Sequence, residues 1–170
     1  MSETHEGVES TSSVSHRLIS KSRQLDVPPE LEGLREEFEA IYSKLSEIAG
    51  DFVVEYKNVL RPFDLDPGEV RIYMVGGRVR GTPLKMDSDI DLIIAVSNVR
   101  QTPGSSLVDA GKWGPMEAME YKIILMQRVR EKLAKICASY HVQDQFHILN
   151  YGSEIPKDDE SENFLLLAKG

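Results

Sequence analysis

Apolar residues recur at alternating steps of three and four along two stretches of the chain, which is the spacing of amphipathic helices. The first stretch begins behind Pro28 and ends before Pro62. It is either one helix to about Leu60 or two helices split at Gly50. Charged residues fill the other face, so packing on a sheet of the same chain is favoured over a coiled coil. The apolar stripe consists of Leu31, Leu34, Phe38, Ile41, Leu45, Ile48, Phe52, Tyr56 and Val59.

The second helical stretch starts at Pro115, a residue that suits the first helical position. We expect its apolar face to pack on the core, with the methionines filling irregular gaps there. Cys137 lies within the same helical pattern and is interpreted as a buried structural thiol. The predicted core face consists of Met116, Met119, Ile123, Met126, Val129, Leu133 and Ile136.

Short apolar runs predict three strands. The first covers residues 71–75, after an Asp-Pro-Gly turn signal, and the second surrounds Asp89-Ile90-Asp91 and continues to residue 96. Residues 141–151 alternate and end at Gly152. This third strand would carry Asp144, Phe146 and Ile148 on one side and Gln143, Gln145, His147 and Leu149 on the other.

The predicted order is helix, strand, short helical turn, strand, helix, strand. Such an order is typical of an α/β (α+β) domain with a small mixed sheet. We expect this domain to cover residues 28–152, between a flexible N-terminal tail at 1–27 and an acidic C-terminal tail at 153–170, whose apolar residues 164–168 could dock on the body. Residues 97–114 predict a long loop, a candidate lid, in which Trp113 could stack on a base or pin the loop to the core.

Charge limits the partners. The chain has 20 basic and 28 acidic residues and a formal charge of −8, which disfavours an extended nucleic acid as a partner. A protein or a small molecule is therefore the expected partner. The single cysteine indicates a reducing compartment, so we expect a cytoplasmic protein, and no apolar run is long enough to span a membrane.

The candidate chemistry lies between the first two strands. Gly76 and Gly77 allow a close backbone approach, so that their N–H groups can point at phosphate oxygens, and Arg78 and Arg80 can add charge-assisted contacts.

Two acids follow this glycine pair on the second predicted strand. Asp89 and Asp91 should share one face of the strand, where a divalent ion would offset the cost of burying two carboxylates. Mg²⁺ is usually held by one or two carboxylates together with phosphates and water. Alternatively, Asp87, Ser88 and Asp89 only form a turn and Asp91 alone faces inward.

The sequence Gly-Gly-Arg-Val-Arg-Gly followed by Asp-Ser-Asp-Ile-Asp-Leu resembles the signature of the DNA polymerase beta nucleotidyltransferase superfamily, and the likeness covers about residues 31–151. Gly77 stands where many minimal members have serine. The resemblance implies two Mg²⁺ ions, or Mn²⁺, bound by three carboxylates that match Asp89, Asp91 and Asp144. It implies a nucleoside triphosphate held by Gly76, Gly77, Arg78, Arg80 and Ser88.

Three functions remain open at this point. The first is nucleotidyl transfer to a hydroxyl of a protein or small molecule by two-metal catalysis. The second is a non-catalytic nucleotide-binding or partner-binding module, antitoxin-like and paired with a separate protein, which applies if Asp144 is not in the site. The third is a structural metal-binding domain without nucleotide.

Overall fold

The computed structural model describes residues 29–80, 89–102, 113–142, 145–157 and 163–170. The predicted order of helix, strand, short helix, strand, helix, strand is confirmed, and further elements are added at both ends. The helices are η1 (Pro29–Leu31), α2 (Glu32–Tyr42), α3 (Leu45–Leu60), η2 (Arg61–Phe63), α4 (Gly77–Arg80), η3 (Val99–Gln101) and α5 (Pro115–Ser139). The strands are β1 (Val70–Val75), β2 (Ile90–Val96), β3 (Phe146–Glu154) and β4 (Phe164–Lys169).

The strands form one mixed sheet in the order β3-β2-β1-β4. Strand β1 is antiparallel to β2 and β4, whereas β2 is parallel to β3. The predicted α/β class with a small mixed sheet is therefore confirmed. The connection between the antiparallel strands β1 and β2 contains α4. The parallel strands β2 and β3 are joined by a crossover that contains the long helix α5, since parallel strands need a connection that returns the chain to the same end of the sheet.

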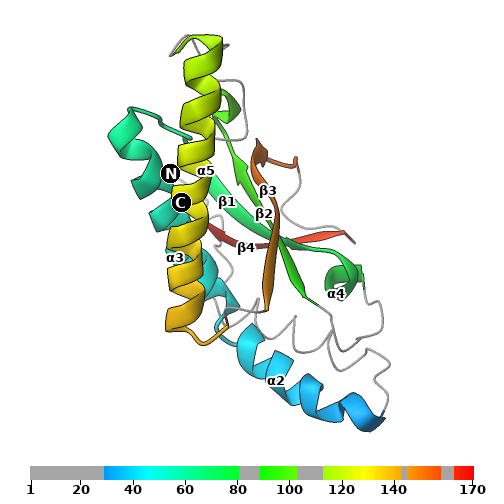
Figure 1. Cartoon of the computed structure of the whole chain (residues 1–170). Helices are drawn as coiled ribbons and strands as arrows, with labels where there is room; N and C mark the ends of the chain where they lie inside the picture. The colour runs from blue at the N-terminus through cyan, green and yellow to red at the C-terminus, as the bar shows by residue number, and fades with distance from the viewer. Residues whose placement is uncertain (1–28, 81–88, 103–112, 143–144, 158–162) are drawn as a thin grey trace, which may run out of the picture.

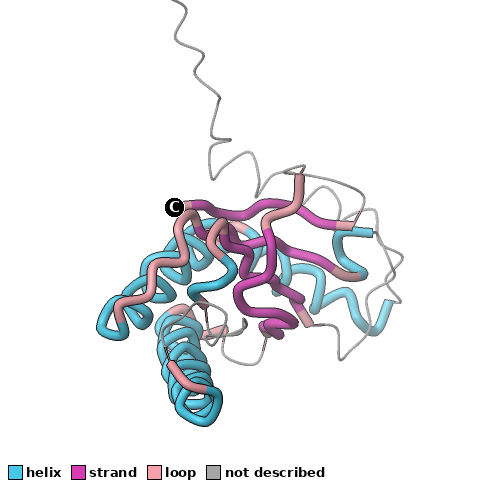
Figure 2. The backbone as a smooth tube through the Cα atoms, turned by 90° about the horizontal axis from the view of Figure 1, so that it is seen from above, coloured by secondary structure: helices cyan, strands magenta, loops and turns pink. Residues whose placement is uncertain are grey.

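Helices α3 and α5 lie side by side on one face of the sheet (Figure 1), and the view from above shows strands on one side and these helices on the other (Figure 2). Alternate residues of β1 and β2 point into this interface and are almost fully buried. Tyr140 Oη at the end of α5 donates a 2.7 Å hydrogen bond to Asp51 Oδ2 of α3. The core between the layers includes Phe52, Tyr56, Ile72, Met74, Ile90, Leu92, Ile94, Leu125 and Val129.

The first helical stretch is split at Ser43–Lys44, so both predicted alternatives, one helix to about Leu60 and a split at Gly50, are wrong. The Ser43 hydroxyl donates to Ala40 O at 2.7 Å, and Lys44 N donates to Ile41 O at 2.9 Å. A continuing α-helix would need Ala40 O to accept from Lys44 N, so the serine side chain competes with the backbone at this point. Gly50 is tolerated inside α3.

The prediction that the α5 methionines fill the core is wrong. Met116 is 80% exposed, Met119 67% and Ile123 62%. The C-terminal half of the predicted face is confirmed, since Val129 and Leu133 are buried and Ile136 packs against the core, whereas in the N-terminal half Ala118 and Leu125 are buried in place of the predicted residues. Cys137 is also buried. The buried residues of α5 are Ala118, Leu125, Val129, Leu133 and Cys137.

Strand β3 begins later than predicted and continues past Gly152 to Glu154. Gly152 has φ +73°, and the pairing of β2 with β3 shifts register between Ile94 and Ala95, which pair with Tyr151 and Ser153. This glycine therefore accommodates a bulge inside the strand and does not end it.

The C-terminal segment expected to be a tail contributes to the sheet. Residues 153–154 complete β3, and β4 pairs with β1 from Val75↔Phe164 to Arg71↔Lys169. Leu165 and Leu167 are 1% and 5% exposed. Their burial explains why this apolar run joins the core. None of the helices in the described ranges combines the length and the apolar character needed to cross a membrane.

Candidate functional site

The glycine turn lies against one of the two acids. Strand β1 ends at Val75, which pairs with Asp91 of the antiparallel β2. The chain then turns at Gly76, whose φ is +85°, a region that side-chained residues rarely adopt. A Cβ at position 76 would lie 2.6 Å from Asp91 Oδ2, closer than real Cβ contacts. The turn and the carboxylate can therefore meet only because residue 76 is glycine.

Asp91 occupies the face of β2 that is turned away from α3 and α5. Its neighbours Ile90 and Leu92 are 0% and 1% exposed and pack in the core, whereas the Asp91 side chain is 30% exposed. Asp89 precedes β2 directly and is exposed. The arrangement leaves Asp91 solvent-accessible on a rigid strand, with Asp89 two residues before it.

His147 of β3 lies beside Asp91. The parallel register pairs Asp91 with His147, and His147 Nδ1 lies 3.5 Å from Asp91 Oδ1. The histidine side chain is 61% exposed. Sequence analysis gave His147 no role, although its alternation placed it on the opposite side of the third strand from Phe146 and Ile148. That side is the one that meets Asp91.

The other predicted residues are placed less completely. Gly77 begins α4, and Arg78 and Arg80 belong to this helix, but their side chains lie outside what the structure describes. Ser88 and Asp144 also lie outside the described residues. Their assignment to the site stays a prediction.

Only parts of the long loop are described. Trp113 at its end stacks on Tyr121 of α5, with ring centroids 4.4 Å apart, and packs against the core. Phe63 of η2 adds an edge-on contact to Tyr121 at 5.9 Å. Trp113 thus pins the end of the loop to the core, the structural alternative considered for it. Residues 103–112, the rest of the candidate lid, lie outside the described ranges.

Within the described residues, no group of three His, Cys, Asp or Glu side chains is placed to hold a metal ion. Asp91 has a part-exposed carboxylate, with an imidazole on one side of it and a glycine turn on the other. This donor set fits an ion that shares its coordination with phosphate oxygens and water better than an ion held in an all-protein cage.

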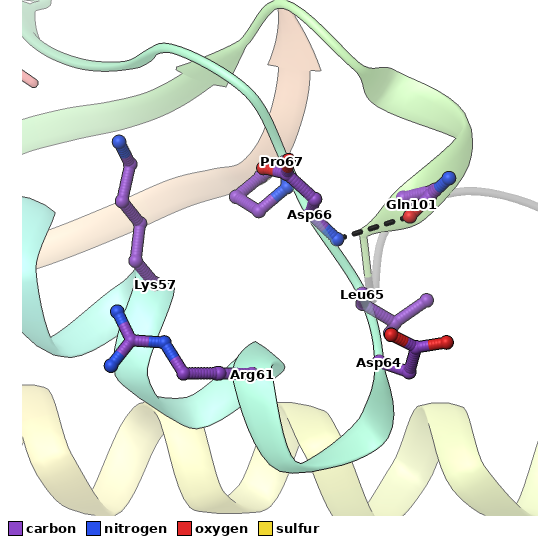
Figure 3. Close-up of a pocket in the computed structure, with 7 residues that line it drawn as sticks. All are labelled: Lys57, Arg61, Asp64, Leu65, Asp66, Pro67 and Gln101. Atoms are coloured by element: carbon purple, nitrogen blue, oxygen red, sulfur yellow. Dashed lines mark hydrogen bonds between the residues drawn. The ribbon is translucent and has the colours of Figure 1, made fainter.

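Two of the hollows that the described residues line lie near the sheet. One, of about 520 Å³, is at the opposite end of β1 from Gly76; Lys57 and Arg61 lie on one side of it and Gln101 on the other, where Gln101 Oε1 accepts from Asp66 N at 3.0 Å (Figure 3). Among the described residues that line it are neither Gly76 nor Asp91. It lies between η2, the segment 64–67 that leads to β1, and Gln101 of η3. It is separate from Asp89 and Asp91.

The other hollow, of about 330 Å³, lies between α5 and β3 and includes His147, Tyr151 and Arg130. Burial raises the pKa of Tyr151, and the neighbouring Arg130 opposes this shift. The hollow therefore lies on the helix side of the sheet, with a cation and a phenol in its wall, and Asp91 is not among its lining residues.

Comparison with known proteins gives one finding. A family model described as a nucleotidyltransferase domain matches residues 56–162, a range that contains the glycine pair, Asp89, Asp91 and His147. No curated protein and no solved structure matches the chain.

Proposed function

Because the chain belongs to the nucleotidyltransferase domain family, we propose that it moves a nucleoside monophosphate from a nucleoside triphosphate to an acceptor hydroxyl on a protein or a small molecule. The contact between the Gly76 turn and the Asp91 carboxylate supports this function best. In such a site the acid that would hold a metal ion and the backbone turn that would hold the phosphates have to be adjacent.

The residues have distinct roles in this proposal. The N–H groups of Gly76 and Gly77 bind phosphate oxygens, and Arg78, Arg80 and Ser88 add contacts to the triphosphate. Asp89, Asp91 and Asp144 would hold two divalent ions. When bound, such ions neutralise negative charge that develops on the phosphates and activate the attacking hydroxyl.

The transfer is an in-line substitution at phosphorus. The acceptor oxygen forms a bond to the α-phosphorus while the bond from this phosphorus to the oxygen bridging to the β-phosphate breaks, so that pyrophosphate leaves. The acceptor proton passes to a carboxylate, for which Asp144 is the candidate, and from there to solvent. Asp91, on a strand hydrogen-bonded on both sides, contributes to orienting the triphosphate for this attack.

The acceptor class follows from charge. A formal charge of −8 opposes the approach of a polyanion, so a hydroxyl of a protein or a small molecule is proposed in place of an RNA end. The hollow between α5 and β3, with Arg130 and Tyr151 in its wall, lies on the other face of the sheet from the Asp91 side chain and is not assigned to the acceptor.

The test is transfer of label from α-³²P nucleoside triphosphates, supplied with Mg²⁺ or Mn²⁺, to proteins and small molecules of a cell extract. Asp91→Asn and Asp89→Asn should each reduce transfer by at least about a hundredfold, the scale of losing one group that stabilises transition-state charge. Glu154 is an exposed acid at the end of β3 that is far from His147. Glu154→Gln is therefore the matched control and should keep full activity. Transfer that survives both Asp variants contradicts the proposal.

A non-catalytic nucleotide-binding module is the second candidate. It applies if Asp144, which lies outside the described residues, does not join Asp89 and Asp91 in the site. Calorimetry that detects nucleotide binding abolished by Asp91→Asn, together with no transfer to any acceptor fraction, would favour this module. Turnover by the isolated chain would exclude it.

A further inference from the structure

We infer that His147 is a metal ligand beside Asp91, so that the site combines nitrogen and oxygen donors and prefers first-row transition ions such as Mn²⁺ to Mg²⁺. This inference rests on the proposed function, because it concerns the ion that would carry the nucleotide. It adds a residue and a metal preference to a site otherwise described by carboxylates alone.

The strand register places His147 where a ligand is needed. Strands β2 and β3 run parallel, and the pairs Ile90↔Phe146, Asp91↔His147 and Leu92↔Ile148 lie in register. Phe146 and Ile148 pack against the core, as do Ile90 and Leu92. Since side chains alternate along a strand, His147 and Asp91 project together from the opposite face. The face of β3 that meets the acid therefore carries an imidazole.

The distance between the two side chains suits shared coordination. The 3.5 Å from His147 Nδ1 to Asp91 Oδ1 exceeds the usual range for an N–H···O hydrogen bond, about 2.7–3.2 Å. Two ligand atoms each about 2.1 Å from one ion are about 3.0 Å apart at a right angle and about 3.4 Å apart at a tetrahedral angle. The pair is thus close to the separation of two ligands of a single ion.

The Gly76 turn fixes which carboxylate oxygen is available. Asp91 Oδ2 faces the turn, where a Cβ would lie 2.6 Å away, and Oδ1 faces His147. An ion between Oδ1 and Nδ1 would remain open to solvent, since the histidine is 61% exposed and the aspartate 30%. Its remaining positions could be filled by water and phosphate oxygens. The site therefore has room for the nucleotide.

The metal preference follows from the donor atoms. Mg²⁺ selects oxygen ligands and binds imidazole weakly, whereas first-row transition ions gain affinity from nitrogen. A nitrogen donor therefore shifts the balance from Mg²⁺ towards Mn²⁺.

Mn²⁺ itself is the probe, because its electron spin couples to a directly bound nitrogen. The full chain, with histidine labelled by ¹⁵N, is loaded with Mn²⁺ without nucleotide, and pulsed electron paramagnetic resonance is recorded beside an unlabelled sample. We expect an imidazole coupling in wild type that changes with the isotope and is absent in His147→Gln. The same variant should weaken Mn²⁺ binding by about tenfold or more while changing Mg²⁺ binding less than about twofold.

Two further variants make the result specific. His141→Asn is the matched control, since His141 is an exposed histidine at φ +58°, a conformation that asparagine tolerates, and it should leave the coupling unchanged. His147→Asp should raise Mg²⁺ affinity and reduce the preference for Mn²⁺, because it restores an all-oxygen donor set. His147 is largely exposed, so neither change at this position should disturb folding.

The outcomes separate this inference from the proposed function. Wild type that binds Mn²⁺ without an imidazole coupling, or His147→Gln that retains the coupling, overturns the role of His147. In that case transfer that depends on Asp91 would still support the proposed function. Conversely, an imidazole coupling lost in His147→Gln, with no nucleotidyl transfer to any acceptor, supports the metal site and contradicts the proposed reaction.

Discussion

Gly76→Ala tests the central contact of the site. The φ of +85° at this position costs a side-chained residue about 1–3 kcal/mol, since the left-handed region brings Cβ close to the backbone. The added methyl would also lie 2.6 Å from Asp91 Oδ2. The carboxylate can rotate away from it, so this clash should displace the acid and not unfold the sheet. We therefore expect the free energy of unfolding to fall by about 1–3 kcal/mol and Mn²⁺ affinity to fall with it.

The assay combines urea denaturation followed by circular dichroism with calorimetric titration of Mn²⁺. Gly50→Ala is the matched control, because a Cβ there has no atom within 4 Å and the residue lies inside α3. This control should gain about 0.5–1 kcal/mol in stability from helix propensity and bind Mn²⁺ like wild type. A Gly76→Ala protein with wild-type stability and wild-type Mn²⁺ affinity would refute the argument.

Three predictions concern the core. Burial raises the pKa of Cys137 from 9.0 to about 11, so its reaction with a disulfide reagent at pH 8 should be about a hundredfold slower than in the urea-unfolded chain, and equal rates would contradict this. The same shift should make unfolding easier as pH rises from about 9 to about 11, because the unfolded chain loses the proton first. Leu165→Ala in β4 should lose about 2–5 kcal/mol and Ile123→Ala, which is 62% exposed, less than about 0.5 kcal/mol; equal losses would be inconsistent with the observed burial.

Local patterns predicted the centre of the fold well. Alternation of apolar residues located β1 and β2, because Ile72 and Met74 of one strand and Ile90 and Leu92 of the other all face the same core. The glycine pair and the acids were recognised from type and spacing alone. The proximity of Gly76 and Asp91 follows from the antiparallel pairing of two strands that are neighbours in the sequence.

The remaining features depend on contacts between distant segments. In the first half of helix α5 the apolar pattern alone did not reveal that Leu125 would pack and Ile123 would not, because the partner α3 decides it. Strand pairing also depends on contacts between distant segments. Alternation tells which residues share a face of β3, but only the register with β2 reveals that His147 stands opposite Asp91.

The pairing of β1 has a consequence for how the protein folds. One neighbour, β2, is the next strand in the sequence. The other neighbour, β4, is the last strand, so that Arg71 pairs with Lys169. Contacts between residues so far apart in sequence form slowly, because the chain between them must first be ordered. During synthesis the strand that leads into Gly76 therefore has one side open until residues 164–169 have emerged. We expect β1 and β2 to gain protection from hydrogen exchange late in refolding, together with β4, so that the site is completed among the last parts of the molecule.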